Sequence, residues 1–125
     1  MMGCSCSSNG ETLIFTCAGA AYSGQASNQA GVKLAQTGAG NLFCAAAVGA
    51  NIPEKMERTR KAGRRVVIDG CGDHCARKIL ESAGFTVEVH VDVTDLGVEK
   101  KPAQPQMIND AKKIADHISQ RLADK

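Results

Sequence analysis

The sequence predicts an α/β fold: a small, mostly parallel sheet of about four strands with helices on both faces, a three-layer arrangement of the Rossmann-like or flavodoxin-like kind. Short apolar runs rich in β-branched residues alternate with longer segments whose apolar residues recur at helical spacing. Gly and Pro punctuate the connections between them. Such alternation favours parallel strands, because a parallel pair needs a crossover connection that is usually a helix.

The first half of the chain supplies two strands and two helices. Strands are expected over residues 12–17 and 41–45, and helices over 24–37 and 53–62. Ser23 stands in the N-cap position of the first helix, and Gly38 stands where a glycine commonly ends one. Pro53 suits the first position of the second helix, since proline lacks the N–H that a helix start leaves unused.

The second half repeats the pattern. A strand over 66–68 follows Arg64 and Arg65, a helix over 73–83 ends at Gly84, an alternating strand runs over 85–93, and a helix spans 106–123. The doubly wound pattern favours the spatial strand order second, first, third, fourth.

Composition bounds the function. A length of 125 residues, with 43% apolar and 22% charged residues, suits one globular domain over residues 12–125 behind a small, polar tail at 1–11 that we expect to be mobile. A net charge of +2 with one Tyr and no Trp argues against nucleic acid as a partner. The chain has neither a membrane-length apolar stretch nor an apolar signal core, so we expect a cytoplasmic protein that does not bind membranes.

Cysteine content is the most informative feature. The six cysteines are Cys4, Cys6, Cys17, Cys44, Cys71 and Cys75. Structural disulfides are rare in a reducing compartment, where clustered cysteines are more often metal ligands or reactive thiols. Cys4 and Cys6 lie in the tail, where chelation would carry the additional cost of ordering the chain.

Four of these cysteines are expected to meet at one edge of the sheet. Cys17 and Cys44 lie at the ends of predicted strands and Cys71 lies just after one. The carboxyl ends of parallel strands share one edge, where ligands bind in such folds. Cys75 lies four residues after Cys71 near a helix start, so both can face the same cleft. Four thiolates suit tetrahedral zinc, and the same ligand number also fits an iron–sulfur cluster.

Two other interpretations of these cysteines stay open. Cys44 lies in an apolar run and could act as a small buried apolar residue. Cys71 and Arg77 have the Cys-x5-Arg spacing of the phosphate loop in cysteine-dependent phosphatases and arsenate reductases. That alternative makes the protein a thiol-dependent enzyme, or a redox protein with Cys75 as the resolving thiol. Asp73 would repel phosphate inside such a loop. Whether the protein is an enzyme stays open.

Polar residues near the expected edge are candidates for supporting the site or lining its cleft. They are Asp69, His74, Arg77 and Lys100. A small-molecule or protein partner is expected at the same edge, whereas His90 and His117 are expected to be ordinary surface residues.

The motifs carry a family resemblance. The triplet Asp69-Gly70-Cys71 lies within VVIDGCGDHCARKILESAG at 66–84, and further matching stretches are FTCAGAAYSGQASNQAG at 15–31, the Phe43-Cys44 region and VTDLGVEK at 93–100. Over residues 12–100 the chain resembles the DGC-domain family, which is described as zinc-binding through four cysteines. The resemblance implies zinc rather than an iron–sulfur cluster, held by Cys17, Cys44, Cys71 and Cys75. The resemblance implies no particular reaction. Because a four-thiolate shell leaves no open position for water, we expect a metal-stabilised binding, sensing or metal-handling module.

Overall fold

The computed structural model describes residues 10–101 and 107–124. Most of the predicted tail, with Cys4 and Cys6, and the last part of the predicted loop after Gly97 lie outside the described residues.

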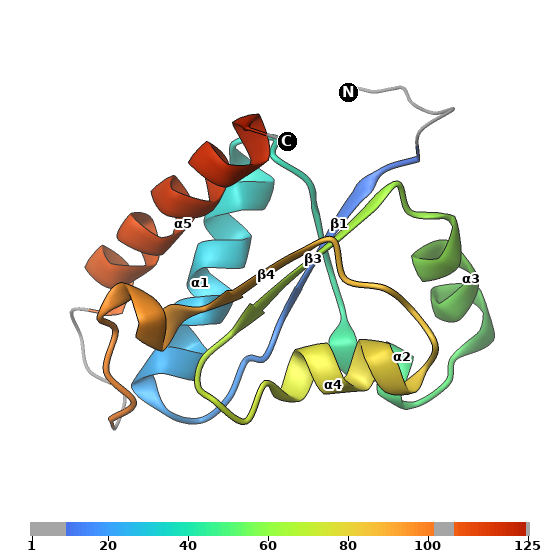
Figure 1. Ribbon diagram of the computed structural model, residues 1–125, viewed down its shortest axis with the longest axis horizontal. Helices are drawn as coiled ribbons and strands as arrows, with labels where there is room; N and C mark the ends of the chain where they lie inside the picture. Colours follow the sequence, from blue (N-terminus) through green and yellow to red (C-terminus); the bar gives the residue numbers. More distant parts are fainter. Residues whose placement is uncertain (1–9, 102–106, 125) are drawn as a thin grey trace.

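A four-stranded, all-parallel sheet forms the centre of the fold (Figure 1). Its strands are β1 (Thr12–Thr16), β2 (Asn41–Phe43), β3 (Arg64–Asp69) and β4 (Val89–Asp92). The predicted fold class is confirmed, and the strands lie in the order β2-β1-β3-β4, which agrees with the doubly wound pattern.

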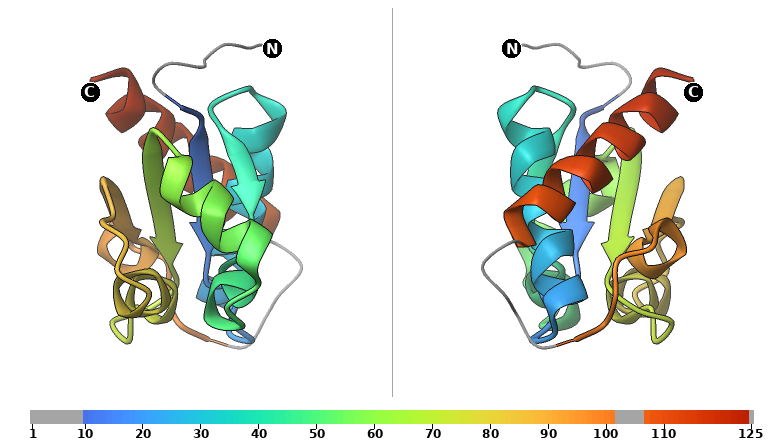
Figure 2. Two further views of the ribbon diagram at one scale, coloured as in Figure 1. Left: turned by 90° about the vertical axis from the view of Figure 1, so that its right-hand side faces the viewer. Right: turned by 90° about the vertical axis from the view of Figure 1, so that its left-hand side faces the viewer.

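Helices cover both faces of the sheet and complete the three layers (Figure 2). The helices are α1 (Tyr22–Gln36), α2 (Ala45–Gly49), α3 (Pro53–Lys61), α4 (Cys75–Ser82) and α5 (Met107–Ala123). Helices α1 and α5 pack on one face, and α2, α3 and α4 lie on the other. Within the described residues, none of the helices is both long and apolar enough to cross a membrane.

Each strand of the central pair divides its apolar side chains between two cores. Ile14 of β1 and Ile68 of β3 face α1 and α5, whereas Phe15 and Val67 face α2 and α4. All four are fully buried. This burial on both sides explains why the strands read as continuous apolar runs rather than as polar–apolar alternation.

The structure differs from the sequence-based expectation at three places. Ser23 lies inside α1, and Ala21 takes the N-cap position. The short helix α2 was not predicted, and it limits β2 to three residues. The predicted strand 85–93 is paired only from Val89 to Asp92, because Val87 packs into the α2/α4 core while Val89 and Val91 pack into the other.

Candidate functional site

The four predicted ligands all lie at the carboxyl edge of the sheet. Cys17 directly follows β1, and Cys44 directly follows β2 and is the N-cap residue of α2. Cys71 lies two residues after β3, and Cys75 opens α4. Because all the strands are parallel, these positions share one edge, as the sequence predicted.

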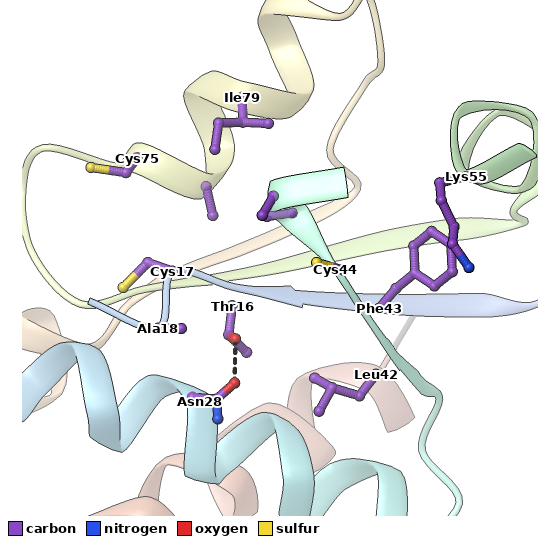
Figure 3. A pocket seen from close by; sticks show the side chains of 13 residues that line it. Thr16, Cys17, Ala18, Asn28, Leu42, Phe43, Cys44, Lys55, Cys75 and Ile79 are labelled. Atoms are coloured by element: carbon purple, nitrogen blue, oxygen red, sulfur yellow. Dashed lines mark hydrogen bonds between the residues drawn. The ribbon is translucent and has the colours of Figure 1, made fainter. Parts of the chain in front are cut away.

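Three of these cysteines line one cavity of about 510 Å³ (Figure 3). Cys17 and Cys75 lie toward one end of it, and Cys44 lies nearer the middle. The other lining residues are Thr16, Ala18, Asn28, Leu42, Phe43, Ala45, Ala46, Lys55, Ala76 and Ile79. Cys71 is not among them, since it lies in the turn between β3 and α4.

The thiols at this edge are unbridged and accessible. Cys17, Cys44, Cys71 and Cys75 are all free, with Cys44 and Cys75 exposed and the other two half-buried. Across residues 10–101 and 107–124, no three His, Cys, Asp or Glu side chains are grouped closely enough to hold one metal ion. The fold therefore brings the cysteines to one edge without assembling a four-sulfur shell.

Close glycine contacts tie the two cysteine-bearing loops together. A Cβ on Gly70 would lie 2.7 Å from the Cα and N of Gly24, and a Cβ on Gly24 would lie 2.7 Å from the backbone of Gly19. The backbone N–H of Cys17 also donates to the carbonyl of Ile68 at 3.1 Å. The β1–α1 loop and the end of β3 therefore hold each other in place through backbone contacts that a side chain would disrupt.

Asp69 fixes the start of α4. Its side chain is only 1% exposed, and its two carboxylate oxygens accept hydrogen bonds from the backbone N–H groups of Ala76 at 2.9 Å and Arg77 at 3.3 Å. These amides belong to the first turn of the helix, where N–H groups have no partner within the helix. Asp69 therefore caps α4 from the end of β3 and positions Cys75, the first residue of that helix.

Two histidines extend this network between β3 and β4. His90 Nε2 donates to Asp69 Oδ2 at 2.8 Å, and His74 Nε2 donates to Asp92 Oδ2 at 3.0 Å. The two imidazole rings meet edge to face with centroids 4.6 Å apart. His74 holds a left-handed backbone conformation, with φ at 51°, directly before Cys75. Such strain persists only where the surroundings fix it, and the bond to Asp92 supplies part of that constraint.

The expectation that His90 is an ordinary surface residue is wrong. The His90 side chain is only 15% exposed. His90 pairs with Val67 across the sheet, and Asp69, which accepts its hydrogen bond, lies two residues further along β3. Arg121 of α5 also donates to its backbone carbonyl at 3.2 Å. A sequence signal existed: a histidine placed between Val89 and Val91 in a buried strand needs a polar partner.

Neither Arg77 nor Lys100 lines the cavity. The Arg77 guanidinium donates to Glu81 at 3.0 Å and to His90 Nδ1 at 3.4 Å. Asp69 already accepts the two helix amides that a phosphate would need. The Cys-x5-Arg spacing therefore does not form an anion-binding loop here. Lys100 is exposed after the 3-10 turn η2 (Val93–Leu96).

The Asp92 carboxyl links stability to pH. Burial alone would raise its pKa, but hydrogen bonds from Thr94 and His74 outweigh that effect and hold the pKa below the usual value. A carboxyl whose pKa is lowered by folding contributes stability above its unfolded pKa, and loses it as pH falls through the folded value.

Asp92→Asn is therefore expected to lower the free energy of unfolding at pH 7 by about 1–2 kcal/mol, the scale of a charge-assisted hydrogen bond. The difference from the wild type should shrink as the pH falls below about 4, near the unfolded pKa of aspartate. Urea unfolding at several pH values measures it. Asp95→Asn, an exposed carboxyl in the same 3-10 turn, is the control. An unchanged gap between wild type and Asp92→Asn from pH 7 to pH 3 would contradict this account.

Comparison with known proteins identifies the family of this chain. The family model described as "DGC domain" matches residues 13–118, a range that includes all four edge cysteines. The chain is also 24% identical over 110 residues to the anaerobic and virulence modulator AnvM of Pseudomonas aeruginosa, covering 88% of this chain and 84% of that protein. No solved structure matches. The family match spans most of the chain, and this protein therefore belongs to the DGC-domain family.

Proposed function

We propose that this protein is a zinc-binding module that holds one Zn²⁺ through Cys17, Cys44, Cys71 and Cys75. The observation that carries the proposal is the cavity at the carboxyl edge, where three free thiols from three separate segments line one space. Cys71 lies in the adjoining turn, four residues before Cys75. Thiolates are preferred zinc ligands, and four of them form the closed shell typical of structural rather than catalytic sites.

The donor set fits zinc in its chemistry, and the cysteine side chains of the described residues would have to move together to form the shell. Cys71 lies between Gly70, which is packed against α1, and Gly72, whose missing Cβ would meet nothing within 4 Å. The second half of the turn therefore has open space in which to move. In this proposal zinc binding draws the Cys71 sulfur and the other three sulfurs together. Such coupling of metal binding to local ordering is usual for thiolate sites.

The proposed role is binding, sensing or metal handling rather than catalysis. A shell closed by four sulfurs has no open position for water or substrate. The cytoplasmic location predicted from the sequence suits this role, because a reducing compartment keeps the thiols available.

Metal content after anaerobic purification tests the proposal. We expect one zinc per chain in the wild type, and loss of most of it in Cys17→Ser, Cys44→Ser, Cys71→Ser and Cys75→Ser, because serine does not replace a thiolate ligand. The double variant Cys4→Ser/Cys6→Ser is the matched control, since both residues lie outside the family match, and it should keep a full zinc.

Three results would count against zinc at this site. The first is a metal-free wild type with four fast-reacting thiols, which points to thiol chemistry instead. The second is iron with visible absorbance, which indicates an iron–sulfur cluster. The third is zinc loss in the Cys4→Ser/Cys6→Ser control, which places the ligands elsewhere.

A further inference from the structure

The cavity at the carboxyl edge extends well past the sulfur atoms. It runs from Cys17 and Cys75 past Cys44 to Phe43 and Lys55 at the opposite end (Figure 3). Its volume of about 510 Å³ is far more than a metal ion occupies. Sites for small organic molecules usually measure about 300–1,000 Å³. The zinc proposal therefore uses only one part of this space.

The walls of the cavity are mainly apolar. Leu42, Phe43 and Ile79 provide the large side chains, and four alanines add further apolar surface: Ala18, Ala45, Ala46 and Ala76. Leu42 is 37% exposed and is one of two large exposed hydrophobic residues in the described part of the chain. Covering such surface with an apolar ligand is favourable because it removes the surface from water.

A single lysine lines one end of the cavity. Among the described residues that line it, Lys55 is the only Lys, Arg, Asp or Glu. The Lys55 ammonium lies 5.7 Å from the centre of the Phe43 ring and forms no ion pair within residues 10–101 and 107–124. The other cations of α3 are all paired: Arg58 with Glu11, and Arg60 and Lys61 with Glu57. The one cation of this helix that lines the cavity thus lacks a counter-charge among the described residues.

We propose that this cavity binds a small organic carboxylate with an apolar body. The body lies between Leu42, Phe43 and Ile79, and the carboxylate pairs with the Lys55 ammonium. At the Lys55 end of the cavity a cation would be repelled by the ammonium, and a neutral molecule would leave the lysine unpaired. This inference does not require zinc, because the ligand contacts Leu42, Phe43, Ile79 and Lys55 rather than the cysteines.

Three probes of equal chain length and different charge test the inference on the full-length protein as purified. Isothermal titration calorimetry should show octanoate binding most tightly. We expect octanamide to bind about fivefold more weakly, the scale of one partly exposed ion pair. Octylamine, positively charged at pH 7, should bind about tenfold more weakly or worse, because its charge repels Lys55.

Substitutions then locate the site. Lys55→Gln should weaken octanoate binding about fivefold and leave octanamide unchanged. Lys78→Gln is the matched control, because Lys78 is exposed on α4 but lines a separate groove beside α2. Ala46→Phe should block all three probes, since Ala46 is an exposed lining residue whose enlargement fills the cavity and leaves the core intact. In amide NMR spectra, octanoate should shift the signals of residues 43–46 and leave Gly49 and Asn51 unmoved.

The inference is overturned if none of the probes binds, if octanoate and octanamide bind equally, or if Lys78→Gln weakens octanoate as much as Lys55→Gln does. It is also overturned if the NMR shifts map away from the cavity. Metal analysis on the same preparation reports on zinc separately, so each of these failures is distinguishable from failure of the zinc proposal.

Discussion

Gly70→Ala is expected to lower the free energy of unfolding by about 2–3 kcal/mol, as is typical when extra volume is forced into a packed region. The added Cβ would lie 2.7 Å from the Cα and N of Gly24 and 3.0 Å from the carbonyl carbon of Ser23. All three atoms are backbone, so no side chain can rotate away. Relief requires β3 to move away from the start of α1, which loosens the contact between the Cys17 loop and the Cys71 turn.

The neighbouring turn residue supplies the control. Gly72 lies two positions further along, on the other side of Cys71, and a Cβ there would meet nothing within 4 Å. Gly72→Ala should change the free energy of unfolding by less than about 0.5 kcal/mol, as at other open surface sites. Urea unfolding of the two variants measures the contrast. Equal stability would mean that the close approach of Gly70 to Gly24 does not exist in solution.

Asp69→Ala is expected to cost about 3 kcal/mol. The change removes a helix cap that serves two backbone amides, typically worth about 1 kcal/mol, and a charge-assisted bond to His90, typically worth about 1.5–3 kcal/mol. Asp73→Ala is the control, since Asp73 is exposed in the same turn and should change stability by less than about 0.5 kcal/mol. Thermal or urea unfolding measures the free energy of unfolding of both variants. Similar losses in Asp69→Ala and Asp73→Ala would contradict the capping role of Asp69.

The bond between Asp69 and His90 can be tested separately. His90→Gln keeps an N–H donor near the position of Nε2, whereas His90→Leu leaves the buried carboxylate without that partner. Stability should therefore be lower in His90→Leu than in His90→Gln. If zinc binds as proposed, its affinity should fall about tenfold or more in His90→Leu, the usual effect of removing support behind a ligand. His117→Leu on the exposed face of α5 should change neither quantity.

Much of the fold was predictable because it depends on local patterns. The apolar runs over β1 and β3 and the helical spacing in α1, α4 and α5 reflect which faces are buried. The end of α1 was also predictable, since Gly38 adopts a φ of 83°, which glycine tolerates best. The sequence-based prediction was wrong where the local pattern and the packing disagree. Val87 continues the alternation of β4 but packs into the opposite core, so the paired strand is shorter than the pattern suggests.

The sequence by itself determined that Cys17, Cys44, Cys71 and Cys75 lie at one edge of a parallel sheet, because strand direction alone places residues that follow the strands there. Only the tertiary structure decided which of them share a cavity and that Lys55 of α3 lines the same space. The same is true of the bond between Asp69 and His90, which lie 21 residues apart, and of the glycine contacts between two loops. The physical reason is that spacing along the chain encodes which face of an element is buried, whereas the partner across a layer depends on register and packing between elements.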